Sequence, residues 1–362
     1  FIHTADIHWG MIPDSDKPWG KKREQAIRLT FQGIIEDARD SRADLLLISG
    51  DLFHRQPLAR DLKEVNYLFS TIPGTRVVII AGNHDRIRKS SALLSFTWAP
   101  NVTFLMGEEF SSVYFEELNT EVYGFSYHTA EITEAKADNI SLPASRRTRI
   151  LMLHGGDAKH VPFDRNALAA SPFSYIALGH IHKAQRVGGR EHVRYAGSPL
   201  PMSFSEQHYH HQVVAFTLEN GCLSDLEAVP IPLRTALHRI PAEPALPAEV
   251  LLQLSDLPLA EEGADRSLWP YLEVQVLLTD PDPGFRHRVE EVLADKAVRL
   301  TSIIPSYPKK EGEEDSRPLS YTDLQKIAPL DMLRHTFTNR FGGDLPEELE
   351  KMFNDVIREV SL

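Results

Sequence analysis

The sequence predicts an α/β protein that is built on two sheets flanked by helices, and two observations lead to this prediction. Over residues 1–85, short apolar runs alternate with amphipathic helical segments, which is typical of a largely parallel sheet. Over residues 97–128, the pattern changes to short β-rich pieces, which we expect to form a second, antiparallel sheet.

Length and composition limit the classes of protein that remain. A chain of 362 residues predicts about two domains, and 42% apolar with 25% charged residues is typical of a soluble globular protein. We find no run near the ~18 apolar residues of a membrane span, and no signal peptide before the first strand. Cys222 is the only cysteine, which excludes an internal disulfide, so we expect a cytoplasmic protein with no membrane association.

One stretch, residues 76–85, shows most clearly how the sequence places polar groups at strand ends. An unbroken apolar run that ends at Ala81 predicts a strand buried on both faces. Gly82 lets the backbone turn, so Asn83 and the residues after it stand where open α/β sheets bind ligands. By itself, this pattern is equally compatible with a strand that ends in an ordinary polar turn.

The same design recurs four times, after predicted strands at residues 1–4, 45–48, 150–153 and 175–178. The polar side chains that follow these strands are Asp6, His8, Asp51, His54, His154, His180 and His182. In the pairs Asp6/His8 and His180/His182 the residues are two apart, so on extended backbone both side chains leave from one face. Five strands that all end in Asp, Asn or His favour a metal site over coincidence.

The remaining elements follow in chain order. A helix between the first two strands is predicted by helical spacing of Ile27, Phe31, Ile34, Ile35 and Ala38. Further elements are a helix near 59–69, strands at 192–195 and 213–218, and a β-α-β unit at 272–304. Prolines crowd at 230–247 and predict a boundary. We therefore expect a first domain at 1–235, a small α+β domain at 236–310, and a linker with C-terminal helices at 311–362.

The candidate ligands mix carboxylate, amide and imidazole groups and contain no sulfur; they are Asp6, His8, Asp51, Asn83, His154, His180 and His182. This set suits Mn²⁺, Fe²⁺ or Zn²⁺ rather than Ca²⁺. Seven ligands are too many for one ion that must also admit a substrate, but they suit two. Two dications ~3.7 Å apart repel by roughly 18 kcal/mol at an effective dielectric of about 20, so they need a shared anion. Asp51 is our candidate for that bridge, and the chemistry expected is phosphoester hydrolysis by two metals.

The motifs Asp-x-His, Gly-Asp, Gly-Asn-His-Asp, His-Gly and Gly-His-x-His, in this order, resemble those of the calcineurin-like metallophosphoesterases. A finer resemblance, to the SbcD-type nucleases of this superfamily, is carried by Gly50–His54, Tyr175–His182, Arg194–Pro199 and Phe204–Glu206. The resemblance implies a two-sheet metallophosphoesterase sandwich flanked by helices, a small α+β capping domain and C-terminal helices. One departure is Trp9, where the family usually has Leu.

The resemblance also implies a role for each residue of the site. One metal would be held by Asp6, His8, Asp51 and His182, and the other by Asp51, Asn83, His154 and His180. The ions expected are two Mn²⁺, with Fe²⁺, Zn²⁺ or Mg²⁺ as substitutes. His84 would face the phosphate as general acid, with Asp85 orienting its ring. His54 would contact the phosphate or guide the nucleic-acid strand, and its plain alternative is a surface histidine.

Two basic clusters are candidates for DNA contact, although each is equally compatible with an ordinary solvated face. The first contains Arg86, Arg88 and Lys89, and the second contains Arg186, Arg190 and Arg194. The net charge of −12 argues against a surface that coats nucleic acid, but it leaves room for such a local basic rim.

The resemblance implies a Mn²⁺-dependent DNA exonuclease and endonuclease that is the nuclease subunit of an SbcCD-like DNA repair complex. Three alternatives are a cyclic-nucleotide or small-molecule phosphodiesterase, a protein phosphatase, and a nuclease-like scaffold whose role is to bind a partner. The protein phosphatases carry Gly-Asp-x-x-Asp-Arg-Gly and Gly-Asn-His-Glu, and this chain has neither motif.

Two helices are predicted at the C-terminus. The first begins at Pro329, ends at Gly342-Gly343 and carries an apolar stripe, and Asp344 can cap the second. The two apolar faces can pack on each other, but the acidic linker at 311–315 separates them from the preceding unit. By resemblance, residues 319–362 are expected to dock the coiled coil of an SbcC-like SMC-type ATPase, and the nuclease is expected to form a homodimer.

Overall fold

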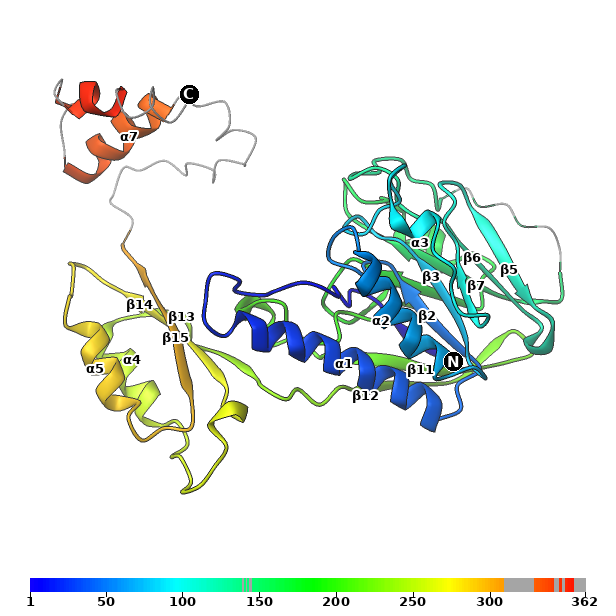
Figure 1. Cartoon of the computed structure of the whole chain (residues 1–362), viewed down its shortest axis with the longest axis horizontal. Coiled ribbons are helices and arrows are strands. Elements are labelled where there is room, and N and C mark those ends of the chain that lie inside the picture. Colours follow the sequence, from blue (N-terminus) through cyan, green and yellow to red (C-terminus); the bar gives the residue numbers. More distant parts are fainter. Residues whose placement is uncertain are drawn as a thin grey trace. The chain divides into compact units, whose positions relative to one another are not determined.

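The computed structural model describes residues 1–138, 140, 142, 145–308, 329–341, 345–346 and 349–354. Its contacts divide the chain into two compact units, Phe1–Ser306 and Tyr307–Leu362. Unit 1 contains three sheets, and Figure 1 labels many of its strands and helices. Among the described residues, no helix is both long enough and apolar enough to cross a membrane.

The first sheet has six strands in the order β12-β11-β1-β2-β3-β4. Strands β1 to β4 are parallel to one another, and β11 is antiparallel to both β1 and β12. Every side chain of β2 is buried, which explains why its sequence is a continuous apolar run. The strands are β1 Ile2–Thr4, β2 Leu45–Ser49, β3 Arg76–Ile80, β4 Val102–Phe104, β11 Gln212–Glu219 and β12 Cys222–Pro230.

The second sheet also has six strands, in the order β5-β6-β7-β8-β10-β9. Its four central strands are parallel, and the edge strands β5 and β9 pair with them in antiparallel fashion. The strands are β5 Ser111–Phe115, β6 Thr120–Gly124, β7 Thr148–His154, β8 Tyr175–Gly179, β9 Gln185–Val187 and β10 Arg190–Tyr195.

The predicted α/β fold with two sheets is confirmed, but the assignment of strands to the sheets was partly wrong. Strand β4, which we expected in an antiparallel second sheet, pairs in parallel with β3 in the first sheet. The second sheet is mixed, because the strands that end at His154 and Gly179 belong to it. A short β-rich segment carries little local information about its partner, since strand stability is set by neighbours that are distant in sequence.

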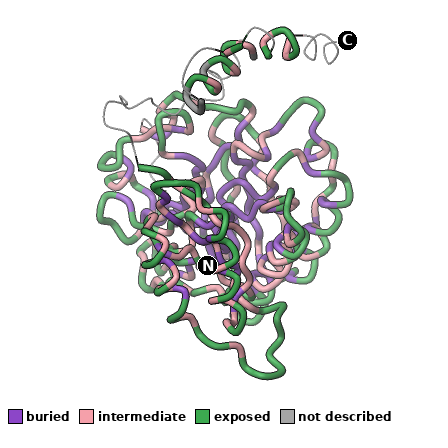
Figure 2. Tube along the Cα trace, turned by 90° about the vertical axis from the view of Figure 1, so that its left-hand side faces the viewer, coloured by how far each residue is buried: buried purple, intermediate pink, exposed green. Residues whose placement is uncertain are grey.

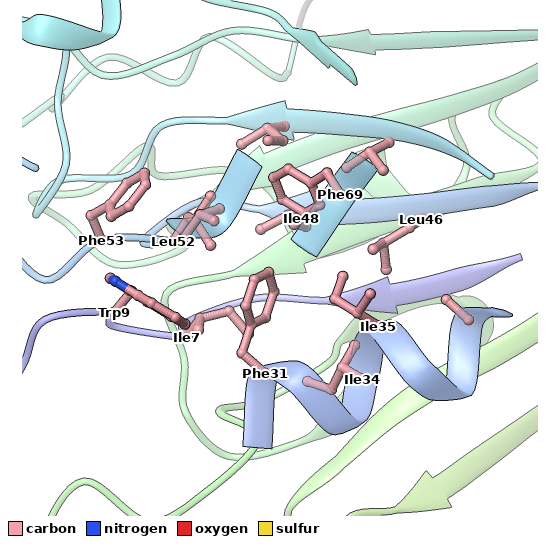
Figure 3. Packing of buried hydrophobic residues seen from close by; sticks show 14 of the residues in the cluster. Ile7, Trp9, Phe31, Ile34, Ile35, Leu46, Ile48, Leu52, Phe53 and Phe69 are labelled. Carbon is pink, nitrogen blue, oxygen red and sulfur yellow. The ribbon is translucent and has the colours of Figure 1, made fainter. Parts of the chain in front are cut away.

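Alternate residues of β2 face two different cores. Leu46 and Ile48 pack in a cluster with the helices α1 (Gly20–Asp40) and α2 (Ala59–Ser70). Leu45 and Leu47 pack in a cluster with the second sheet. Figure 3 shows Phe31 of α1 within the first cluster, and burying a side chain of this size stabilises a fold by roughly 1.5–3 kcal/mol. One face of the first sheet is thus covered by helices and the other by the second sheet.

The helix predicted from the periodicity of residues 27–38 is confirmed. It is α1, and all five apolar residues that predicted it are buried. The long helices of this layer are α1 Gly20–Asp40 and α2 Ala59–Ser70. The short helices of unit 1 are η1 Ala92–Leu94, η2 Glu116–Leu118, α3 Arg165–Ala169, η3 Phe204–Glu206 and η4 Arg266–Leu268.

A small three-stranded module, residues 237–306, ends unit 1. Its strands β13, β14 and β15 are parallel, and the predicted β-α-β unit is confirmed as β14-α5-β15. Of the five prolines at 230–247, Pro241 and Pro244 lie in β13, an edge strand where proline is tolerated, while Pro230 ends β12 and Pro247 begins α4. The predicted domain boundary after residue 235 stays a prediction. The elements are β13 Leu237–Ala245, α4 Pro247–Ser255, β14 Tyr271–Leu277, α5 Phe285–Val292 and β15 Arg299–Ser306.

Unit 2 contains helix α7, Pro329–Phe341, which begins at the predicted proline. Residues 349–354 are also helical. Apolar side chains of the two segments, together with Leu345, line a pocket of about 270 Å³; those of the segments are Leu333, Phe337, Leu349, Met352 and Phe353. The acidic linker 311–315, the glycines at 342–343 and the proposed cap Asp344 lie outside the described residues. In Figure 2, the buried segments of unit 1 gather in its interior, and its exposed residues lie on the outside.

Candidate metal centre

The candidate ligands lie directly after, or at the end of, strands from both sheets. Strands β1, β2 and β3 of the first sheet lead to one part of the set, and β7 and β8 of the second sheet lead to the other. Because parallel strands place their carboxyl ends at one edge, the two sheets deliver these side chains to a common region. The first sheet supplies Asp6, His8, Asp51 and Asn83, and the second supplies His154, His180 and His182.

Four of these residues have left-handed backbone conformations. The φ angles are 55° at Asp6, 53° at His8, 51° at Asp51 and 93° at His180. Our expectation that the Asp6/His8 and His180/His182 pairs lie on extended backbone was therefore wrong. Residues other than glycine rarely adopt such angles, and when they do, the strain is concentrated at functional sites. The turn at each strand end, and not the alternation of a strand, brings these side chains together.

The first group of ligand atoms belongs to Asp6, His8 and His182, whose nitrogen and oxygen atoms lie within 4.8 Å of one another. The Nε2 atoms of His8 and His182 are 3.1 Å apart. The Nδ1–H of His182 donates to Oε1 of Glu206, at 2.9 Å. This bond leaves Nε2 of His182 as the nitrogen that faces the group.

The second group belongs to Asp6, Asp51 and His154. The Nδ1–H of His154 donates to the carbonyl of Ser49 at 2.9 Å, so Nε2 faces the other ligands. That nitrogen lies 3.1 Å from Oδ1 of Asn83 and 3.3 Å from Oδ2 of Asp51. The same Asp51 oxygen is 3.9 Å from Nε2 of His8, so Asp51 lies between the two groups.

Two glycines make this close approach possible. A Cβ atom on Gly82 would lie 2.2 Å from Oδ1 of Asp51, and one on Gly50 would lie 2.3 Å from Nδ1 of His154. Real Cβ atoms essentially never show such distances, so a larger residue at either position would displace the ligands. Gly50 also has a φ angle of 88°, which glycine adopts at little cost.

His180 is held by a carboxylate that the sequence analysis did not single out. Its Nε2–H donates to Oδ2 of Asp157 at 2.8 Å, and its backbone N–H donates to both carboxylate oxygens of Asp6. The imidazole of His180 lies next to that of His154, with ring centroids 5.2 Å apart. Its ligand atoms group with Asp157 and His160, and not with the second group. A carboxylate three residues after His154 was the signal for this contact.

The buried carboxylates of Asp6 and Asp51 are stabilised in their charged form by nearby positive charge. Burial alone would raise the pKa of Asp51, but the charge and hydrogen bond of His154 hold that pKa well below its usual range. Burial likewise opposes a charge on His154, yet Asp51 raises the pKa of His154 to about 9. Burial raises the pKa of Asp6 and lowers that of His8. Carboxylates, an amide and imidazoles that converge in a buried region are a donor set that fits divalent cations.

Two further histidines, His54 and His84, lie beside the first group. Nδ1 of His54 lies 3.3 Å from Nδ1 of His8, and the rings of His54 and His84 are stacked with centroids 4.9 Å apart. The Nδ1–H of His84 donates to the carbonyl of His54 at 3.1 Å, which leaves Nε2 unconstrained by this bond.

The expected contact between Asp85 and the ring of His84 was wrong. Asp85 is fully buried, and its oxygens accept the backbone N–H groups of Phe53 at 3.0 Å and Gly82 at 2.7 Å. Burial, and next the charge of Asp51, raise the pKa of Asp85 to about 7. Asp85 therefore fixes the turn that carries Asn83 and His84, and the His54 carbonyl holds the ring.

A groove of about 550 Å³ adjoins these histidines. Its lining includes Asn83, His54 and His84, together with three arginines, Arg55, Arg86 and Arg88. Two of these arginines belong to the first predicted basic cluster, whereas Arg55 was missed, although it directly follows His54. Lys89, the third member of that cluster, is exposed and does not line the groove.

The second predicted basic cluster is partly neutralised. Arg186 and Arg194 both form ion pairs with Glu191, while Arg190 is exposed. Because its charge is shared with a carboxylate, this cluster offers less to a phosphate chain than the arginines of the groove.

Comparison with known proteins identifies relatives over most of the chain. The protein is 26% identical to the SbcD subunit of the nuclease SbcCD of Escherichia coli K12 over 281 residues, which cover 64% of this chain and 68% of that protein. It is 23% identical to the SbcD subunit of the nuclease SbcCD of Bacillus subtilis over 416 aligned positions, covering 97% of this chain and 96% of the other. It is 30% identical to the DNA double-strand break repair protein Mre11 of Methanocaldococcus jannaschii, over 51% of each chain.

Two family models match the chain. The model of the type 5 capsule protein repressor C-terminal domain, SbcD_C, matches residues 234–341. The model of the calcineurin-like phosphoesterases matches residues 1–184, which is just over half of the 362 residues. That match contains all seven candidate metal ligands, from Asp6 to His182. The chain belongs to the calcineurin-like phosphoesterase family.

Proposed function

We propose that the protein is a DNA nuclease that hydrolyses phosphodiester bonds with two Mn²⁺ ions. The observation that carries the proposal is the pair of ligand groups that share Asp6, with one oxygen of Asp51 3.3 Å from His154 of the second group and 3.9 Å from His8 of the first. A carboxylate between two sets of ligands is what two dications require, since it screens their mutual repulsion. Oxygen and imidazole donors without sulfur favour Mn²⁺ over softer ions.

Two sets of ligands from this chain would each bind one ion. Asp6, His8 and His182, with Asp51, would hold one ion, and Asn83, His154 and His180, with Asp51, would hold the other. When bound, the two ions supply Lewis-acid stabilisation of the phosphate and an activated water. His84, with Nδ1 bonded to the His54 carbonyl, presents Nε2 for contact with the phosphate and for proton transfer.

The choice of DNA as substrate is supported by the groove and by the names of the relatives. Arg55, Arg86 and Arg88 extend positive charge beyond the candidate ligands, as a chain of phosphates requires and a single small phosphate does not. The relatives described above are named as nucleases and as a DNA double-strand break repair protein. Together these observations favour a DNA nuclease over a phosphodiesterase for small molecules.

We also propose that unit 2 binds a coiled-coil ATPase, as the names of the SbcCD nuclease relatives suggest. An apolar pocket formed by α7, Leu345 and residues 349–353 supports this proposal, because helices with an apolar face dock into grooves of this kind.

Replacement of Asp51 by Asn is expected to empty the metal centre. The isosteric amide keeps the shape of the side chain but removes the charge that balances both cations. Elemental analysis of the purified variant should show a large loss of Mn²⁺, and hydrolysis of DNA should cease. A variant that keeps about two Mn²⁺ per chain would contradict the bridging role.

His84→Ala should separate catalysis from metal binding. This histidine lies outside both groups of candidate metal ligands, so the variant should keep its Mn²⁺ content. The rate of DNA hydrolysis should fall by ~10²–10⁴-fold, the usual contribution of a general acid. Single-turnover assays at saturating Mn²⁺ measure this rate, and wild-type turnover would show that His84 has no such role.

Arg55→Ala tests whether the groove binds phosphates. Removal of one phosphate contact should weaken DNA binding and lower the slope of log affinity against log salt by about 1. Fluorescence anisotropy with a short duplex in a chelator, at several salt concentrations, measures both quantities. Arg186→Ala is the matched control, because Arg186 is paired with Glu191. Equal slopes for the two variants would place the DNA elsewhere.

Deletion of residues 319–362 should end co-purification with the SbcC-like ATPase. Cleavage of short DNA with Mn²⁺ should stay nearly intact, because the candidate ligands all lie in unit 1. Leu333→Asp, which places a charge in the apolar pocket, should reproduce the loss of binding in the full chain. If the truncated chain still binds the ATPase with full affinity, the docking proposal is wrong.

A further inference from the structure

Glu206 binds the imidazole of His182, and both oxygens of its carboxylate accept hydrogen bonds. Its Oε1 accepts the Nδ1–H of His182 at 2.9 Å, and its Oε2 accepts the backbone N–H of Met202 at 2.8 Å. Both oxygens of the carboxylate are therefore engaged, and the side chain of Glu206 is only 13% exposed. The bond fixes the tautomer of His182 and aims Nε2 at His8, 3.1 Å away.

The short helix that carries Glu206 is anchored in the three-stranded module. Phe204, at the start of this helix, is 7% exposed and packs in one cluster with Leu237 of β13 and Tyr271 of β14. Immediately after the helix, the side-chain oxygen of Gln207 accepts the backbone N–H of Arg239 in β13. The position of Glu206 is thus set by contacts with the module on both sides.

The other two histidines of the second sheet have partners of a different kind. His154 is fixed by the carbonyl of Ser49 at the end of β2, and His180 by Asp157 in the loop after β7. Ser49 ends a strand of the first sheet, and Asp157 lies in a loop that directly follows a strand of the second. Of these three histidines, His182 is the one whose partner is attached to the module.

We infer that Glu206 is a positioning residue for His182, and that through it the three-stranded module sets the affinity of the first metal site. The inference rests on the proposed function only in that His182 binds a metal ion. Loss of such a carboxylate partner typically costs 10–100-fold in metal affinity. A glutamine at 206 offers one acceptor oxygen to two donors, so either His182 or Met202 would lose its partner.

The test is a Mn²⁺ titration of the full chain by calorimetry, combined with electron paramagnetic resonance to distinguish coupled ions from isolated ones. Glu206→Gln should weaken one of two sites by about 10–100-fold and convert coupled ions into an isolated ion at limiting Mn²⁺. Glu227→Gln, an exposed glutamate on β12, is the matched control and should bind like the wild type. Wild-type affinity for both ions in Glu206→Gln would overturn the positioning role.

Variants of the module test the coupling without touching the carboxylate. Phe204→Ala and Leu237→Ala should each weaken the same site, whereas Leu252→Ala, at a position 65% exposed on α4, should not. If only Glu206→Gln weakens binding, the coupling to the module is wrong. A wild-type chain that binds Mn²⁺ but does not cleave DNA would refute the nuclease proposal and leave this inference standing. A wild-type chain that binds no divalent ion would overturn both.

Discussion

The carboxylate of Asp51, 2% exposed and placed between His8 and His154, is the constraint on which the rest of the site depends. A buried charge of this kind is tolerated only when it is paired. The surrounding turns are built to provide the partners: Gly82 and Gly50 allow backbone and imidazole to approach within distances that no Cβ permits. The left-handed turns at the strand ends complete the arrangement, at a cost that the packed sheets can support.

The parts of the fold that were predictable are those whose signal is local. A buried parallel strand is predicted from its apolar run alone, and so is the position of a polar ligand that follows it closely, as with β2 and Asp51. The sheet to which β4 belongs is decided by its neighbour β3 and could not be seen in its own residues. The two prolines of β13 are tolerated for a related reason, because proline is excluded from a strand only where its missing N–H is needed.

The candidate site divides in the same way. The residue types of the candidate ligands were visible in the sequence, but the groups that orient their rings were not. Asp157 and Glu206 bind the two histidines that follow β8, and the His54 carbonyl binds His84. A backbone carbonyl has no residue type, so no sequence pattern can reveal it. This is why Asp85, the adjacent carboxylate, was a reasonable but wrong partner for His84, and why its burial serves the turn instead.

The anchors of the histidines also differ in how rigid they are. A carbonyl at the end of β2 can move only with the first sheet, so the ring of His154 is as fixed as the core beneath it. Glu206 ends a single helical turn that precedes β11 in the chain. This turn packs through Phe204 against Leu237 and Tyr271 of the module, which are far from it in sequence. Small shifts of packed elements change such contacts in steps rather than smoothly. The position of His154 in one candidate metal site therefore depends on the stability of the first sheet. The position of His182 in the other site depends also on the stability of the module.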